Sequence, residues 1–194
     1  MLAILPPQEE WPSLVQKFYV ALNMEDIVEP MRQDPEWVNI KDIPKHLRNA
    51  VIAIEDHEFY DHGAIAPESI LRAMLVNVIE GEISQGGSTL TQQFVKNTFL
   101  THEQTMERKI EEAILAIILE EKYSKDEVLE MYLNSTYFGA GATGVHQASK
   151  VYFGRHVSHL TLAEAADLAA LPYAPSALCP RDNPADCKQR QMLV

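Results

Sequence analysis

The chain has 194 residues, of which 46% are hydrophobic and 23% are charged. It is therefore long enough for one sizeable core, and its composition is not that of a disordered or fibrous protein. Its 16 Lys and Arg residues against 28 Asp and Glu residues give a formal net charge of −12, which repels polyanions and argues against nucleic acid as a partner. An anionic ligand would have to be met by a local cluster of basic side chains.

Two regions of the chain differ in their pattern. Residues 1–36 contain several prolines and little sustained periodicity, so we expect a lead-in segment that is extended or partly ordered. Residues 37–194 are dominated by helical patterns and predict one mostly α domain, with short β pieces expected near residues 36–40. The longest apolar run, residues 113–119, is far shorter than the ~20 residues of a membrane-spanning helix, so no such helix is predicted.

Helix boundaries are indicated by prolines and capping residues. Pro44 and Pro67 stand where a helix can begin, because a proline in the first turn loses no hydrogen bond. The first of these helices should run through Ile54, and the second should end near Gly81. Further helices are predicted to start at the caps Ser88, Thr105, Ser124 and Thr161, the last two in capping boxes with Glu127 and Glu164, and another to span residues 145–153.

The block from Gln85 to Asn97 begins with two glycines and continues with hydroxyl and amide side chains and one lysine. Such polar side chains are seldom buried in a hydrophobic core. With Ser88 as the N-cap, the first helical turn would present free backbone N–H groups that favour an anion, and Lys96 adds a positive charge two turns further along. We expect an anion-binding helix start, with an ordinary capped surface helix as the alternative.

Glu55 and Asp56 stand at the end of an apolar helical run. A glutamate that leaves a hydrophobic segment is partly desolvated, which raises its pKa and suits it to proton transfer near neutral pH. The alternative is a solvated helix end, although acidic residues there are unfavourable to the helix dipole.

Glu112 is a second candidate acid. Arg108 lies four residues before it and Lys109 three before it, so the three charges share one helix face. An intrahelical salt bridge explains this spacing, whereas a catalytic role would need Glu112 and Glu55 to meet across a cleft. The spacing alone does not decide between the two.

Histidines and cysteines give weaker signals. The seven histidines lack metal-ligand spacing, so packing or surface roles are expected for them. Cys179 and Cys187 lie in a proline-rich segment and form either a disulfide, in an oxidising compartment, or two reduced thiols. No Ser/His/Asp arrangement stands out, because Ser88 has no histidine near it in the sequence.

Four motifs follow one another along the chain. They are Glu55-Asp-x-x-Phe-x-x-His62, Gln85-Gly-Gly-Ser-Thr-x-Thr-Gln-Gln-x-x-Lys-Asn97, Arg108-Lys-x-x-Glu112 and Lys125-x-x-x-Leu-x-x-Tyr-Leu-Asn134. In this order they resemble the peptidoglycan glycosyltransferases of glycosyltransferase family 51, which are the polymerase domains of class A penicillin-binding proteins and the monofunctional transglycosylases. The resemblance runs from about Trp37 to the C-terminus.

The resemblance implies a mostly α, lysozyme-like fold with a head lobe and a jaw lobe that lies against the membrane. It implies polymerisation of lipid II, a disaccharide-pentapeptide on undecaprenyl pyrophosphate, into β-1,4-linked glycan with inversion and release of undecaprenyl pyrophosphate. The expected partners are lipid II, the growing lipid-linked glycan, the membrane surface, cell-wall synthesis proteins and moenomycin-type inhibitors. The expected place is the extracytoplasmic face of the bacterial cytoplasmic membrane, with a transmembrane anchor outside this sequence.

The resemblance also assigns roles to residues. Glu55 would be the general base, and Glu112 would orient the basic groups or help to hold a divalent cation, Mg²⁺ or Mn²⁺, that bridges the pyrophosphate. No organic cofactor is expected. The residues expected to bind substrate are Asp56, Phe59, His62, Ser88, Thr89, Gln92, Gln93, Lys96, Asn97, Arg108 and Lys109.

Three positions depart from the family pattern. Ala64 stands where a glycine is usual, with Gly63 available for the turn. Gln104 replaces a common arginine, and Cys179 replaces a common asparagine.

Two other functions stay open. One is a lysozyme-like enzyme that cleaves glycan, which would not need the anion-binding block. The other is a catalytically weak lipid-II-binding or scaffold module, which retention of both glutamates argues against.

Overall fold

A computed structural model of the chain describes residues 19–68, 87–100, 105–175, 188–189 and 191–192. The chain divides into two compact units, residues 1–34 and 35–194. In the first unit, helix α2 (Met24–Arg32) has Met24 and Val28 buried one turn apart on the same face. The predicted boundary at residues 36 and 37 stays a prediction.

The second unit is built from helices, which confirms the mostly α prediction. They are η2 (Ile40–Asp42), α3 (Lys45–Glu55), α5 (Leu90–Phe99), α6 (Met106–Lys122), α7 (Lys125–Ser135), α8 (Val145–Phe153), η3 (Val157–His159), α9 (Leu162–Ala170) and η4 (Leu171–Tyr173). Within the described ranges there is no strand, and the β pairing there is one isolated bridge between Tyr137 and Thr143. The head and jaw lobes stay a prediction.

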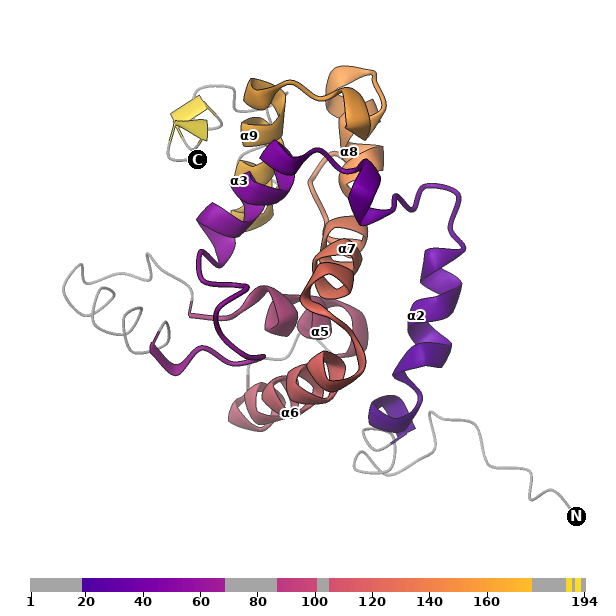
Figure 1. The fold of residues 1–194 in the computed structure, drawn as a ribbon, viewed down its shortest axis with the longest axis vertical. Helices are drawn as coiled ribbons and strands as arrows, with labels where there is room; N and C mark the ends of the chain where they lie inside the picture. Colours follow the sequence, from indigo (N-terminus) through magenta and orange to yellow (C-terminus); the bar gives the residue numbers. More distant parts are fainter. Residues whose placement is uncertain (1–18, 69–86, 101–104, 176–187, 190, 193–194) are drawn as a thin grey trace, which may run out of the picture. The chain divides into compact units, whose positions relative to one another are not determined.

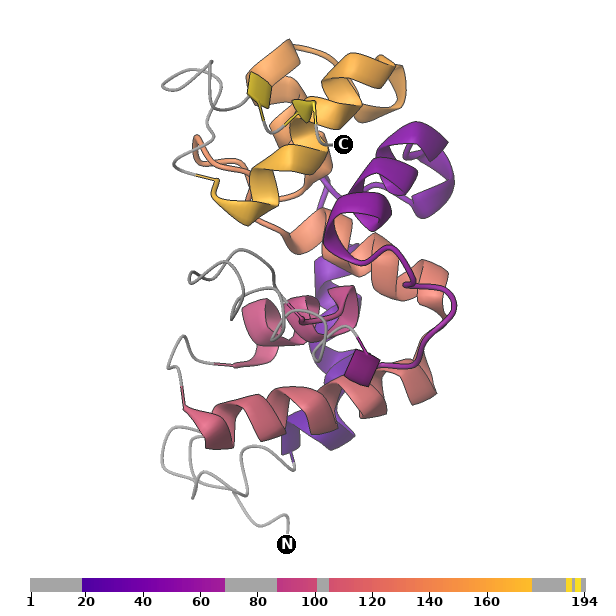
Figure 2. The same cartoon turned by 90° about the vertical axis from the view of Figure 1, so that its left-hand side faces the viewer.

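Helix α7 forms much of the core of this unit. Its residues 128–133 are all buried, and it contacts α5, α6, α8 and η2. Helix α5 packs against both α6 and α7, while α3 packs along α9 (Figure 1, Figure 2). The four motifs of the sequence therefore lie at the end of α3 and in the loop after it, and on α5, α6 and α7, of which the last three pack against one another.

Most predicted helix starts are confirmed, but one cap was wrong. Thr105, Ser124 and Thr161 are the N-caps of α6, α7 and α9. Ser88 is not the cap of α5, because Thr89 accepts the N–H of Gln92 through its side chain, and Gln92 Oε1 accepts the N–H of Thr89, each at 3.1 Å. This reciprocal capping box satisfies two helix donors at once, and the Thr-x-x-Gln spacing could have revealed it.

The segment expected to hold short β pieces has none. Side chains of α7 take the place of a neighbouring strand: Asn134 accepts the N–H of Val38 at 2.8 Å and donates to its carbonyl at 2.9 Å. Glu130 accepts the N–H of Ile40 at 2.7 Å and the indole N–H of Trp37 at 3.1 Å. The extended backbone is thus satisfied without a sheet.

Candidate active site

Glu55 is the last residue of α3. Val51 and Leu47, respectively one and two turns before it on the same face, are fully buried. Glu55 therefore continues the core-facing side of the helix and is itself half-buried. Its Oε2 accepts a hydrogen bond from Nε2 of Gln93 on α5 at 3.1 Å. The predicted base and one predicted substrate-binding residue are therefore brought together.

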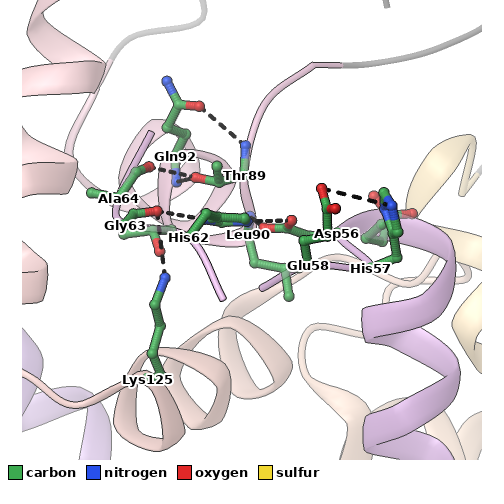
Figure 3. Close-up of polar contacts among 12 residues, drawn as sticks. Asp56, His57, Glu58, His62, Gly63, Ala64, Thr89, Leu90, Gln92 and Lys125 are labelled. Atoms are coloured by element: carbon green, nitrogen blue, oxygen red, sulfur yellow. Dashed lines mark hydrogen bonds and ion pairs between the residues drawn. The ribbon is translucent and has the colours of Figure 1, made fainter. Parts of the chain in front are cut away.

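Asp56 ties the end of α3 to the start of α5. It is buried, and its Oδ2 accepts the backbone N–H of Leu90 at 2.9 Å while its Oδ1 lies 2.6 Å from Nε2 of His62 (Figure 3). A carboxylate at a helix N-terminus is favoured by the exposed N–H groups and the helix dipole. These contacts support a structural role for Asp56, and its predicted contact with substrate stays untested.

The loop after α3 is held by further contacts. Nδ1 of His62 faces the carbonyl of Gly63 (Figure 3). Phe59 is fully buried, and Nζ of Lys125 lies 4.6 Å from its ring centroid, which is a cation–π contact. Phe59 and His62 therefore shape the loop, and their predicted contact with substrate is untested.

Ala64 fits this loop without strain. Neither Ala64 nor Gly63 has a positive φ, so the turn does not need glycine. The carbonyl of Ala64 accepts a hydrogen bond from Oγ1 of Thr89 at 2.7 Å (Figure 3). The loop is thereby fastened to the cap of α5, and the departure from the family pattern is accommodated.

A cluster of basic groups surrounds Glu112 on α6. Glu112 is 1% exposed, and its Oε2 lies 2.9 Å from Nη1 of Arg108 while its Oε1 pairs with Nζ of Lys109. The salt-bridge interpretation of this spacing is therefore confirmed. Lys109 Nζ also donates to Oγ of Ser88 at 2.8 Å, so the cluster on α6 contacts the residue directly before the cap of α5.

The buried acid and its two cations carry a net charge of +1. Arg108 is largely buried, and its Nε has no hydrogen-bond partner in the described part of the chain. A guanidinium presents several N–H donors in a fixed planar fork that suits phosphate oxygens. The cluster therefore has the charge and donor chemistry of an oxyanion site.

The remaining predicted residues of α5 divide into two groups. Thr89 and Gln92 are buried and bonded to each other in the capping box, which favours a structural role over substrate contact. Lys96 is half-buried and Asn97 is exposed, both one turn or so beyond Gln93. Within the described residues, Lys96 makes no ion pair, so its charge is available to a ligand.

Tyr132 also belongs to the site, although no sequence pattern predicted it. It is fully buried on α7, and its hydroxyl donates to Oε1 of Gln93 at 3.4 Å. Burial, and then the negative charge of Glu55, raise the pKa of Tyr132 well above its ordinary value. Its place in the motif from Lys125 to Asn134 was the available signal, but nothing in that spacing shows its contact with α5.

The described residues do not fit a resident divalent cation. No group of three His, Cys, Asp or Glu side chains among them is arranged to hold a metal ion. Both oxygens of Glu112, the expected ligand, already face cationic side chains, which is the opposite of a metal-binding environment. The surroundings of Glu112 therefore suit an anion and not a metal ion.

Several predictions fall outside the described residues. They concern Gln85, Gly86, Gln104, Cys179, Cys187 and the helix predicted from Pro67 to Gly81 beyond its first two residues.

Comparison with known proteins identifies the family. A family model described as transglycosylase matches residues 21–194, so the chain belongs to the transglycosylase family, which confirms the resemblance of its motifs. The chain is 52% identical over 158 residues to penicillin-binding protein 1A of Aquifex aeolicus, covering 81% of this chain and 22% of the relative. It is 46% identical over 172 residues to penicillin-binding protein 1F of Bacillus subtilis, covering 89% and 24%.

A third relative is close to this chain in length. The Cupriavidus necator protein named "Putative transglycosylase H16_A0665" is 41% identical over 193 residues, covering 100% of this chain and 78% of the relative. By contrast, the chain spans less than a quarter of the two penicillin-binding proteins.

Proposed function

We propose that the chain is a peptidoglycan glycosyltransferase that polymerises lipid II into β-1,4-linked glycan with inversion and release of undecaprenyl pyrophosphate. The observation that carries the proposal is the placement of a half-buried carboxylate and a cationic cluster against the same end of α5. Gln93 on α5 bonds Glu55, and Ser88, directly before the cap of α5, bonds Lys109. Membership of the transglycosylase family supports the same activity.

Glu55 acts as the general base in this proposal. It removes the proton from the 4-hydroxyl of the acceptor sugar as that oxygen attacks the anomeric carbon of the donor. The new bond joins the acceptor oxygen to the anomeric carbon, and the bond from that carbon to the pyrophosphate oxygen breaks. Attack from the face opposite the leaving group converts the α-linked donor into a β linkage.

The cluster on α6 receives the leaving group. A departing pyrophosphate gains negative charge, so it needs positive charge and donors more than a proton. Arg108 and Lys109 supply both, and Lys96 adds a further charge from α5. Glu112 contacts Arg108 and Lys109 and orients them.

The lipid anchor of the substrate places the activity at a membrane. We propose the extracytoplasmic face of the bacterial cytoplasmic membrane, with lipid II, the growing glycan, cell-wall synthesis proteins and moenomycin-type inhibitors as partners. None of the helices in the described part of the chain combines the length and apolar character that crossing a bilayer requires.

The test is incubation of the chain with lipid II in detergent or bilayers, followed by separation of the glycan products by length. We expect long glycan chains and released undecaprenyl pyrophosphate. Unconverted lipid II, in a preparation where a related polymerase works, would replace the proposal with a lipid-II-binding scaffold. Shortening of added glycan without use of lipid II would replace it with a glycan-cleaving enzyme.

A further inference from the structure

Tyr132 and Glu55 both contact the side-chain amide of Gln93. It projects from α7, which packs against α5, and its side chain is fully buried. Its hydroxyl is 3.4 Å from Oε1 of Gln93, and Nε2 of the same amide is 3.1 Å from Oε2 of Glu55. The three side chains therefore form a chain of hydrogen bonds from the core to the carboxylate.

The chemistry of the three side chains decides which of them donates and which accepts in each hydrogen bond. A carboxylate only accepts hydrogen bonds, so the amide of Gln93 must turn its NH₂ toward Glu55. Its carbonyl oxygen then faces Tyr132, which must donate. A rotated amide would set a carbonyl oxygen against the carboxylate, which is repulsive.

The environment of Tyr132 keeps it a donor. Its pKa is raised well above the ordinary value, first by burial and next by the negative charge of Glu55. It therefore stays protonated at neutral pH. Without its hydroxyl, the carbonyl oxygen of Gln93 would lose the partner described for it in the core, and the amide would be free to rotate.

We infer that Tyr132 is a positioning residue that directs Glu55 through Gln93. The inference rests on the proposed function, in which Glu55 removes a proton. It assigns Gln93 a role in orienting the base, in place of the substrate contact that the sequence analysis predicted. The effect should fall on the chemical step, because lipid II itself need not touch Tyr132.

Tyr132→Phe removes the hydroxyl and keeps the ring. We expect kcat for lipid II to fall about tenfold, the worth of one buried hydrogen bond, with KM nearly unchanged. The acid limb of the pH–rate profile should move to higher pH, because the carboxylate form of Glu55 loses a hydrogen bond. Tyr123→Phe, at the buried C-cap of α6, is the matched control and should leave both parameters and the profile unchanged.

A double-mutant cycle tests whether Tyr132 acts through Gln93. Gln93→Met should lower kcat at least as much as Tyr132→Phe, and the double variant should lose no more than Gln93→Met alone. Additive losses, or a loss confined to KM, would overturn the inference while leaving the proposed function intact.

A second readout does not depend on activity. The titration of Glu55, followed through its carboxyl carbon by NMR, should move to higher pH in Tyr132→Phe and Gln93→Met but not in Tyr123→Phe. An unchanged titration in Tyr132→Phe would overturn the inference even if lipid II proved not to be the substrate. Failure of the unaltered chain to polymerise lipid II would instead count against the proposed function alone.

Discussion

The two glutamates of the site are held in opposite ways. Glu55 ends a helix, is half-buried and receives a hydrogen bond from a neutral amide. Glu112 lies within a helix, is 1% exposed and pairs with two cations. Glu112 is thus neutralised by the two cations that it arranges, whereas the contact described for Glu55 comes from an uncharged donor.

This difference in surroundings predicts that Glu55 matters mainly to the reaction and Glu112 also to the stability of the fold. A buried ion pair is costly to break because the remaining charge is left without compensation, so Glu112 should matter to folding. The amide of Gln93 would also bond a glutamine at position 55, so this contact should survive the loss of the charge of Glu55. Three predictions test this contrast, from the largest expected effect to the smallest, and a fourth concerns a pH effect elsewhere in the same unit.

Glu55→Gln should abolish most activity and leave stability unchanged. The amide keeps an acceptor for Gln93 but cannot take up a proton, so the polymerisation rate should fall about 10³-fold or more. The free energy of unfolding should stay within about 0.5 kcal/mol of that of the unaltered chain. Urea unfolding and initial rates, measured on the same preparation, check both. A variant that retained a tenth of the rate would show that Glu55 is not the base.

Glu112→Ala should lower stability and activity together. It leaves Arg108 and Lys109 facing each other without their shared acid, which should cost about 3 kcal/mol of unfolding free energy. Glu121→Ala, an exposed acid on the same helix, is the control and should change stability by less than about 0.5 kcal/mol. Equal stability of the two variants in urea would contradict the contrast between the glutamates.

Lys109→Met should reduce activity more than stability. Lys109 is 39% exposed on its side chain, so its ion pair adds little to folding. Loss of one positive donor at the leaving group should slow polymerisation about 10²-fold. Lys150→Met is the control, since Lys150 belongs to α8, outside the four sequence motifs, and pairs with Glu36. Similar rates for the two variants would remove Lys109 from the proposed mechanism.

His146 should produce a small pH effect away from the site. Burial, and then the neighbouring His156 and Lys150, lower the pKa of His146, although Glu36 opposes them. The unfolded chain therefore binds the proton more readily, so stability should be full above the ordinary pKa of about 6.5 and decline as pH falls below it. Urea unfolding between pH 7.5 and 5.5 should show a smaller decline for His146→Gln. An equal decline would assign the effect to other groups.

Local patterns predicted the helices well. Each N-cap or capping box is defined by residues no more than four positions apart in the sequence. Those at Thr105, Ser124 and Thr161 each start the expected helix. The pairing of Arg108 with Glu112 is likewise set by the spacing of one helical turn. Such features depend on neighbours in sequence and could be predicted from it.

Contacts between distant segments could not be predicted in this way. Gln93 reaches Glu55 across 38 positions, and Tyr132 reaches Gln93 across 39. These bonds depend on how α3, α5 and α7 pack, which periodicity does not specify. The same holds for residues 37–40, where side chains of α7 replace the strand that the pattern favoured.

Binding of lipid II without turnover tests the contrast between the two glutamates most directly. Equilibrium binding of labelled lipid II to the Glu55→Gln and Glu112→Ala variants in detergent separates the proton acceptor from the organiser of the pyrophosphate site. We predict that Glu55→Gln binds lipid II within about threefold of the unaltered chain, whereas folded Glu112→Ala binds it at least tenfold more weakly, a difference of about 1.4 kcal/mol. Weak binding by Glu55→Gln together with unchanged binding by Glu112→Ala would contradict the assignment of their roles.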